Sequence, residues 1–191
     1  MSISKKSDLS RREFLLAAGA AGLGCVLPGP AAQAQAPGEG GAQGGEHPKV
    51  GTRPFGKTGA EVSILALGGI FDIPNNQIVL EQALEWGVTY WDTADCYEGG
   101  RSEEGIGAFF ERRPEARKKV FLVSKSDSRD PGGFTGLMSR SLERLKTDCI
   151  DLYMVHGLRN VRELTDDLRK AVERAKLAKR IRFFGFSAHS D

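Results

Sequence analysis

The amino-acid sequence predicts an α/β fold with a largely parallel sheet, and three observations lead to this class. From about residue 50 onward, apolar runs typical of strands alternate with segments of helical periodicity. A helix between two successive strands carries the chain across the sheet, so the strands run parallel. The strands are also apolar on both faces, as covered parallel strands are. A doubly wound open sheet and an α/β barrel both satisfy this pattern.

The first β/α unit starts with an apolar run over residues 62–67, which predicts a strand closed by Gly68-Gly69. A helix is expected over residues 78–86, because apolar side chains recur on one of its faces, namely at Leu80, Ala83 and Leu84. Gly87 stands just past this helix, where a glycine can adopt the left-handed backbone of a C-cap.

The second and third strands are predicted over residues 88–91 and 120–124, with a helix between them that starts at Ser102. Glu103 and Glu104 favour this start, because acidic side chains in the first turn complement the positive end of the helix dipole. The apolar stripe of this helix has i, i+3, i+4 spacing and consists of Ile106, Phe109 and Phe110.

The remaining pattern predicts a helix over residues 134–145, a strand over 150–155, a helix over 161–178 and a strand over 181–186. The fingerprint of a dinucleotide-binding open sheet is a Gly-x-Gly-x-x-Gly turn after the first strand. Residues 68–71 read GGIF instead, so this fingerprint is absent.

Net charge and cysteine count exclude several classes of protein. The formal charge of +2 lies wholly within the first 34 residues, so the rest of the chain is neutral. A neutral body lacks the excess positive charge that would indicate binding to nucleic acid or to an anionic membrane surface. Three cysteines are too few for a disulfide scaffold. Cys25 lies in a predicted leader, and we interpret Cys96 and Cys149 as small core residues, with a disulfide or a ligand role as the alternative.

Residues 1–34 are predicted to be an export signal. Arg11-Arg12 precede an apolar run rich in Ala and Gly, which is too short to remain in a bilayer. Residues 32–34 read AQA and supply the small side chains that signal peptidase needs. The paired arginines resemble the twin-arginine signal, whose substrates cross the membrane folded. An ordinary signal with two chance arginines is the alternative.

This leader predicts the organisation and location of the chain. We expect the twin-arginine export machinery as a partner, a periplasmic destination and no stable membrane anchor. Residues 35–48 are rich in Gly, Ala and Gln without apolar periodicity, which is typical of a flexible linker. Residues 49–191 then form the folded body.

Polar residues follow the predicted strands at their carboxyl ends, where both candidate architectures bind ligands. Asp92 and Tyr97 follow the second strand, Lys125 ends the third and His156 the fourth. Each has an ordinary explanation as well, as a helix cap, a rim aromatic or the polar end of a strand. Four residues of complementary chemistry at one rim favour a site.

The chemistry of these side chains suggests proton transfer. Asp92 can pair with Lys125, and a nearby ammonium stabilises a phenolate, which makes Tyr97 a plausible general acid. His156 can donate a hydrogen bond to a substrate oxygen. A proton donor without a nucleophile suits reduction of a carbonyl by hydride from a cofactor. A metal site of His156, His189 and an acid lacks a recognisable ligand spacing, so no metal site is predicted.

Five segments resemble the aldo-keto reductase superfamily and cover nearly everything from residue 53 onward: RPFGKTGAEVSILALGG, GVTYWDTADCYEGGRSEEGIG, VFLVSKS, SLERLKTDCIDLYMVHG and KRIRFFGFSAHS. The resemblance implies a TIM-type (β/α)8 barrel that binds NADP(H), less often NAD(H). It also implies a catalytic tetrad with Tyr97 as the acid/base, formed by Asp92, Tyr97, Lys125 and His156. By the same resemblance Gly69, Ile70 and Asp92 lie near the nicotinamide, and Ser187 contacts its carboxamide.

The chain departs from the family pattern in two places. Residues 187–189 read SAH, where the family often has Ser-Asn. The sequence also stops just after the fifth strand, so we expect a partial barrel with about five of eight β/α units, from a fragment or a truncated reading frame.

The function predicted from these residues is NADP(H)-dependent reduction of an aldehyde or ketone to an alcohol, or the reverse oxidation. The partner is then a small carbonyl substrate. The alternative is a non-catalytic barrel, or an inactive truncated fragment, that binds a ligand or partner at the same rim. A periplasmic oxidoreductase that keeps its nicotinamide bound is a third possibility.

Overall fold

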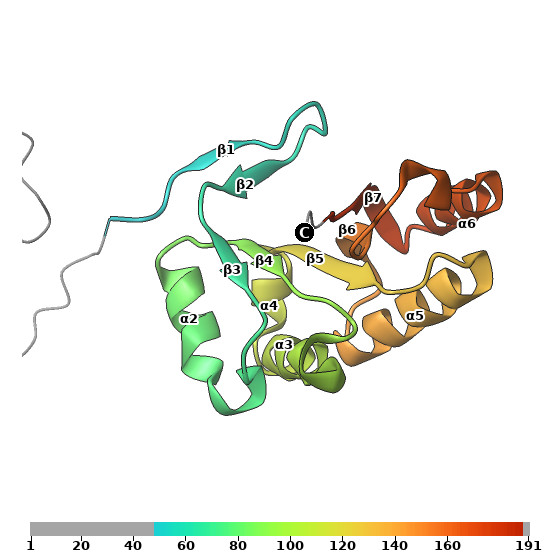
Figure 1. Cartoon of the computed structure of the whole chain (residues 1–191). Helices are drawn as coiled ribbons and strands as arrows, with labels where there is room; N and C mark the ends of the chain where they lie inside the picture. Colours follow the sequence, from blue (N-terminus) through green and yellow to red (C-terminus); the bar gives the residue numbers. More distant parts are fainter. Residues whose placement is uncertain (1–47, 189–191) are drawn as a thin grey trace, which may run out of the picture. The chain divides into compact units, whose positions relative to one another are not determined.

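Five parallel strands form the main sheet of the computed structural model, which describes residues 48–188. The predicted signal peptide (1–34) lies outside the described residues, as do nearly all of the predicted linker and His189. Each strand pairs with the next one along the chain, in the order β3 (Ala66–Gly68), β4 (Tyr90–Asp92), β5 (Phe121–Ser126), β6 (Ile150–Val155) and β7 (Ile181–Phe186) (Figure 1).

This sequential strand order decides between the two architectures that the sequence left open. A doubly wound sheet reverses its strand order at a switch point, where two crossovers leave in opposite directions. The described sheet has no such reversal, because every strand lies beside its sequence neighbours. Sequential parallel order is that of an α/β barrel, so the five strands follow a barrel topology.

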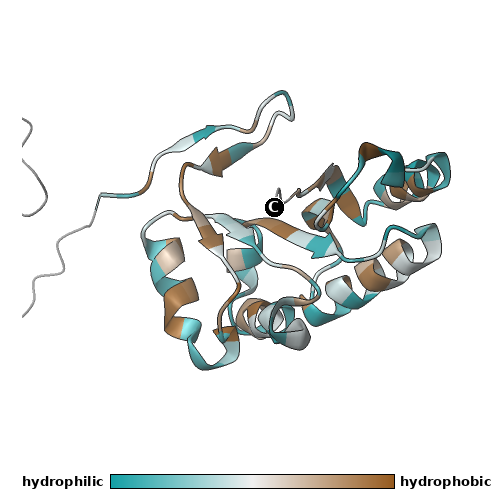
Figure 2. Cartoon of the chain, viewed as in Figure 1, coloured by the Kyte–Doolittle hydropathy of each residue, from teal (hydrophilic) through white to brown (hydrophobic). Residues whose placement is uncertain are grey.

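Helices connect the strands and cover one face of the sheet. The main helices are α2 (Gln77–Glu85), α3 (Arg101–Arg112), α5 (Pro131–Arg144) and α6 (Asp166–Leu177), and the short helices are η1 (Ile73–Asn75), η2 (Tyr97–Gly100), α4 (Pro114–Arg117) and η3 (Val161–Glu163). In Figure 1, α2, α3 and α5 lie on one side of strands β3 to β5, and the β1–β2 hairpin lies on the other. Apolar and hydrophilic residues alternate along α2 and α5 (Figure 2), as in amphipathic helices.

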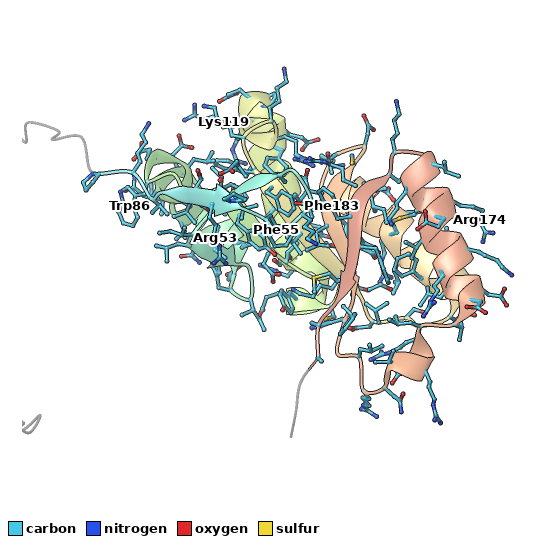
Figure 3. All side chains as sticks on the ribbon, turned by 90° about the horizontal axis from the view of Figure 1, so that it is seen from above. Arg53, Phe55, Trp86, Lys119, Arg174 and Phe183 are labelled. Atoms are coloured by element: carbon cyan, nitrogen blue, oxygen red, sulfur yellow. The ribbon has the colours of Figure 1, made fainter. Side chains whose placement is uncertain are left out.

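Two groups of buried apolar residues lie on opposite faces of the sheet, because side chains alternate along each strand. The first group joins the strands to the helices and includes Trp91, Leu122 and Tyr153. The second includes the strand neighbours Phe121, Val123 and Leu152. Phe55 and Phe183, both labelled in Figure 3, pack against this second group. We call the face that carries the second group the inner face.

The strand predicted over residues 62–67 is wrong in its extent, because the structure divides it between two sheets. β2 (Glu61–Ser63) pairs antiparallel with β1 (Thr52–Pro54), and β3 starts only at Ala66. The Ser63 hydroxyl fixes the break: it accepts bonds from the backbone N–H groups of Thr89 and Tyr90 and donates to the carbonyl of Leu65. The Ser63 side chain therefore takes the place of backbone hydrogen bonds where the strand is interrupted.

The helix predicted over residues 161–178 is also divided, into η3 and α6. Each part has its own N-terminal cap. Asn160 and Glu163 form a capping box on η3, and the Thr165 hydroxyl accepts a bond from the backbone N–H of Leu168 at the start of α6. Two caps only five residues apart end the first helical turn before the second helix begins.

Most of the other predicted elements agree with the structure. The predicted strands over 150–155 and 181–186 have the bounds of β6 and β7. Gly87 follows α2 with φ +78°, the left-handed conformation expected of a C-cap. The predicted stripe of α3 is buried: Ile106, Phe109 and Phe110. Within residues 48–188, no helix is both long enough and apolar enough to cross a membrane.

Candidate active site

The carboxyl ends of strands β4, β5 and β6 bring three of the predicted site residues to one rim. Asp92 is the last residue of β4, Lys125 lies in β5, and His156 follows β6 directly. Asp92 pairs in register with Val123, and Lys125 lies two residues further along β5, so both point to the inner face. The backbone N–H of His156 donates to the carbonyl of Ser126, which extends the β5–β6 ladder to the rim.

The Lys125 ammonium is nearly buried and makes three hydrogen bonds. Its Nζ donates to Asp92 Oδ1 at 2.5 Å, to the Thr93 carbonyl at 2.8 Å and to the Tyr97 hydroxyl at 3.2 Å. An ammonium group has three donors, so these acceptors satisfy all of them. The expected contact between Asp92 and Lys125 is therefore present, and it holds a positive charge beside the Tyr97 hydroxyl.

Tyr97 is presented by a tight left-handed turn in front of α3. Glu98, Gly99 and Gly100 follow it with φ values of 52°, 65° and 99°. These left-handed residues reverse the direction of the chain. Tyr97 therefore stays at the rim, while α3 packs on the helix-covered face of the sheet. The Lys125 Nζ lies 4.6 Å from the Tyr97 ring centroid, and the Tyr97 and His156 rings meet edge to face at 5.8 Å.

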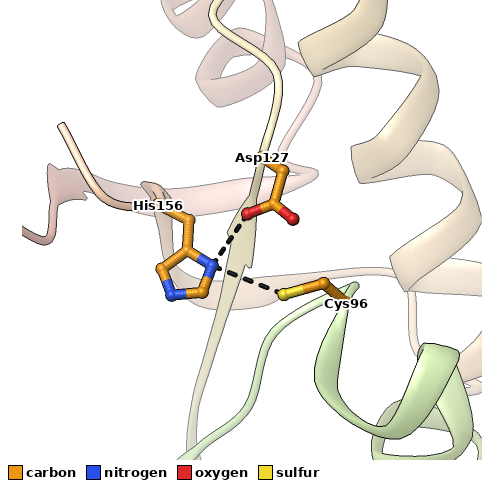
Figure 4. A group of neighbouring side chains, drawn as sticks. All are labelled: Cys96, Asp127 and His156. Carbon is orange, nitrogen blue, oxygen red and sulfur yellow. Dashed lines mark hydrogen bonds and ion pairs between the residues drawn. The ribbon is translucent and has the colours of Figure 1, made fainter.

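His156 contacts two residues that the sequence analysis did not assign to the site (Figure 4). Its Nδ1 lies 2.8 Å from Asp127 Oδ1 and 3.5 Å from Cys96 Sγ. Asp127 stands two residues after Lys125, and this spacing could have indicated a side chain directed to the same face. Our interpretation of Cys96 as a core residue is wrong, because Cys96 is exposed.

The residues predicted to contact a cofactor lie at the same strand ends. The Gly69 N–H donates to the Asp92 carbonyl at 2.7 Å, and the Ser187 hydroxyl accepts from the N–H of Gly157 at 2.9 Å. Ile70 is 69% exposed. A Cβ at Gly69 would lie 2.9 Å from the Asp92 carbonyl oxygen, so only glycine fits there without a shift. Gly69 and Ser187 are thus tied to the backbone around Asp92 and His156.

A buried polar network supports the rim from the helix side. Glu103 of α3 is fully buried, accepts a bond from the Ser124 hydroxyl at 2.6 Å and lies 3.4 Å from an Arg144 nitrogen. Burial raises the pKa of Glu103. Arg144 also donates to the backbone carbonyl of Asp95 at 3.1 Å. The loop that carries Tyr97 is thereby fixed to α5.

Two other groups in the 92–97 loop have raised pKa values. Burial, and next the charge of Asp127, raise the pKa of Asp95, whose buried Oδ1 atom has no hydrogen-bond partner among residues 48–188. Partial burial, and next a hydrogen bond with Asp127, raise the pKa of the Cys96 thiol to about 11. At neutral pH this thiol is therefore protonated and a poor nucleophile.

A protein-family model described as the aldo/keto reductase family matches residues 68–190 of the chain. The chain is 36% identical over 127 residues to the aldo-keto reductase yakc [NADP(+)] of Schizosaccharomyces pombe, which covers 59% of this chain and 36% of that protein. It is also 36% identical over 93 residues to the glyoxal reductase of Bacillus subtilis, which covers 46% of this chain and 33% of that one.

The fold is similar to that of solved structures. The holo form of aldo-keto reductase AKR11C1 from Bacillus halodurans superposes with a TM-score of 0.65 at 29% sequence identity. The match covers 74% of this chain and 51% of that one. The chain thus spans about a third to a half of the length of these three proteins.

Proposed function

The chain belongs to the aldo/keto reductase family, and from this premise we propose that it reduces an aldehyde or ketone to an alcohol with NADP(H), or catalyses the reverse oxidation. The observation that carries the proposal is the position of Lys125. Its ammonium bridges the Asp92 carboxylate and the Tyr97 hydroxyl at 2.5 and 3.2 Å. The glyoxal reductase of Bacillus subtilis supports a small carbonyl compound as substrate.

In the proposed reaction Tyr97 is the general acid. Its hydroxyl gives a proton to the carbonyl oxygen, and the phenolate that remains is stabilised by the adjacent ammonium of Lys125. Asp92 holds Lys125 in place through the 2.5 Å ion pair. Because the lysine already has its three acceptors, little side-chain reorganisation accompanies proton transfer.

His156 orients the substrate in this proposal. Its Nδ1 faces Asp127 and Cys96, and we propose that the ring contacts the substrate oxygen from this position. The Asp127 carboxylate lies 2.8 Å from Nδ1 and so fixes the orientation of the ring. Asp127 is a positioning residue in this proposal, because it acts through His156.

NADP(H) is the proposed cofactor, with NAD(H) as the alternative, and when bound it supplies the hydride. The name of the Schizosaccharomyces pombe relative supports NADP(H). The residues present fit such a group: Gly69 packs its backbone against that of Asp92, where a Cβ would clash, and the next side chain, Ile70, is exposed there. We propose that Gly69, Ile70 and Asp92 lie near the nicotinamide and that Ser187 contacts its carboxamide.

The experiment that tests the proposal joins two measurements on the full chain. Fluorescence titration with NADPH measures cofactor binding, and NADPH consumption with glyoxal and methylglyoxal measures reduction. Binding together with consumption supports the proposal. A failure to bind NADPH or NADH contradicts it, since reduction then has no hydride source, and favours ligand binding without catalysis at the same rim.

We also propose that residues 1–34 direct the chain to the periplasm by the twin-arginine route and that residues 35–48 link the signal to the body. Arg11-Arg12 before an apolar run support this. Cell fractionation and intact mass of the exported protein test it, with cleavage expected after Ala34. Replacing both arginines by lysine should keep the chain in the cytoplasm, whereas Lys5→Arg with Lys6→Arg should not. Equal export of both variants would contradict the proposal.

A further inference from the structure

Three side chains with metal-ligating atoms converge at the rim, and one of them, His156, also belongs to the proposed tetrad. They are Cys96, Asp127 and His156, and one ligand atom from each lies within 4.8 Å of the others. They follow β4, β5 and β6 respectively, so three successive strand ends each supply one donor. Figure 4 shows the thiol and the carboxylate both directed at Nδ1 of the imidazole.

We propose that Cys96, Asp127 and His156 bind one thiophilic divalent cation of the Zn²⁺ class, with a fourth coordination position open to water. Thiolate, imidazole and carboxylate are the side chains that bind Zn²⁺ in proteins. Mg²⁺ and Ca²⁺ prefer oxygen ligands, so a set with one sulfur and one nitrogen selects against them. This proposal concerns binding alone and does not depend on carbonyl reduction.

The distances suit this coordination. Tetrahedral bonds of about 2.3 Å to sulfur and about 2.0–2.1 Å to nitrogen place those two ligand atoms about 3.5 Å apart. Cys96 Sγ and His156 Nδ1 are 3.5 Å apart. The Asp127 oxygen lies 2.8 Å from Nδ1, and the same geometry needs about 3.4 Å. The Asp127 side chain is half exposed, so it can make this small outward movement.

The two loops that carry Asp127 and His156 are already held together. The Arg129 guanidinium donates to the backbone carbonyls of Asp127 at 2.6 Å and of His156 at 2.9 Å. Arg129 is held in turn by Glu163, whose Oε2 accepts a hydrogen bond from the Arg129 Nε at 2.9 Å. Ligands on loops fixed in this way lose little freedom when an ion binds, which favours affinity.

Binding in this site releases protons. Zn²⁺ takes the Cys96 sulfur as the thiolate and Nδ1 without its proton, so the thiol proton and any proton on Nδ1 leave to solvent. The thiol forms a metal–sulfur bond, and no electron is transferred, since Zn²⁺ has no redox chemistry.

Co²⁺ is the probe that tests the proposal, because it replaces Zn²⁺ and gives a thiolate charge-transfer absorption band. We expect the full chain to give this band with one equivalent of Co²⁺ and to lose it when one equivalent of Zn²⁺ is added. Cys96→Ser should abolish the band. Asp127→Asn should weaken binding at least about 10-fold, since even an outer-shell partner is worth that much.

Matched controls come from a second Asp–Cys pair that has no histidine beside it in the described residues. Cys149→Ser, Asp148→Asn and Cys25→Ser should leave the band and its stoichiometry unchanged. A band that survives Cys96→Ser, or that disappears in Cys149→Ser or Cys25→Ser, would place the ion elsewhere and overturn the proposal. So would the absence of any band in a chain whose circular dichroism shows that it is folded.

Discussion

Lys125 and Asp92 form a 2.5 Å ion pair between adjacent parallel strands, at the point where both strands reach the rim. The register of β4 and β5 explains the contact. Asp92 pairs with Val123, and the lysine, two residues further on, has its side chain on the same face as Val123. Its long side chain therefore reaches back over the end of β4, where the Thr93 carbonyl and the Tyr97 hydroxyl complete its hydrogen bonds.

Tyr97→Phe should remove carbonyl reduction while NADPH binding survives. The variant loses only the hydroxyl that Lys125 contacts, so the proton donor is missing and the ring remains. We expect turnover to fall by about 10²–10⁴-fold, the usual contribution of general acid–base catalysis. Steady-state kinetics and fluorescence titration check this. Tyr153→Phe is the control, because that tyrosine is buried on the helix face. A Tyr97→Phe variant with unchanged turnover would disprove the proton-donor role.

Asp92→Asn should destabilise the fold more than Lys125→Met does. In the first variant a nearly buried ammonium keeps only neutral acceptors, which costs about 1–3 kcal/mol. In the second, Asp92 is left near the surface, with 27% of its side chain exposed, and can be hydrated. Urea denaturation of both single variants and of the double variant measures the coupling. Additive free energies of unfolding would mean that the ion pair contributes nothing to stability.

Gly107→Ala should destabilise the protein, although alanine favours helices. A Cβ at Gly107 in α3 would collide with the backbone carbonyl oxygen of Arg144 at the end of α5. We expect a cost of about 1–3 kcal/mol from this overpacking. Gly136→Ala is the matched control, because no atom of the described part of the chain lies within 4 Å of its Cβ position in α5. That variant should be more stable by about 0.5–1 kcal/mol. Equal effects in thermal unfolding would refute the close packing of α3 on α5.

Asp95→Asn should flatten the pH dependence of stability. Burial raises the pKa of Asp95 above its ordinary value of 3.8, so the fold favours the protonated carboxyl. The contribution of Asp95 to the free energy of unfolding is therefore largest below that ordinary value and falls as the pH rises through the raised pKa. The variant lacks this loss, so its stability relative to the native chain should increase with pH, by at most about 1.4 kcal/mol per unit.

Urea denaturation between pH 3.5 and 7 (roughly the range over which a carboxyl with a raised pKa titrates) measures this difference. Glu103, whose pKa is also raised, contributes equally to both proteins and cancels in the difference. Asp148→Asn, an exposed surface change, should show no such trend. A constant difference between native chain and Asp95→Asn across the pH range would show that Asp95 does not titrate differently on folding.

Local patterns in the sequence predicted most of the elements and the placement of Asp92, Lys125 and His156 at the strand ends. Strand runs such as 150–155 and helix stripes such as the one in α3 repeat with the periods of their structures, so nearest neighbours along the chain suffice to recognise them. The rule that parallel strands present ligands at their carboxyl ends then selected Asp92, Lys125 and His156. The same local patterns failed at residues 62–67, because Ser63 bonds to a strand 26 residues away.

By itself, the sequence determined the alternation of strands and helices and the chemical types of the residues at the strand ends. Only the tertiary structure decided the sequential strand order, the bridging position of Lys125 and the pairing of His156 with Asp127 and Cys96. The physical reason is that strand order and side-chain contacts depend on packing between segments far apart in the chain. The periodicity of one segment carries no information about which other segment it will pack against.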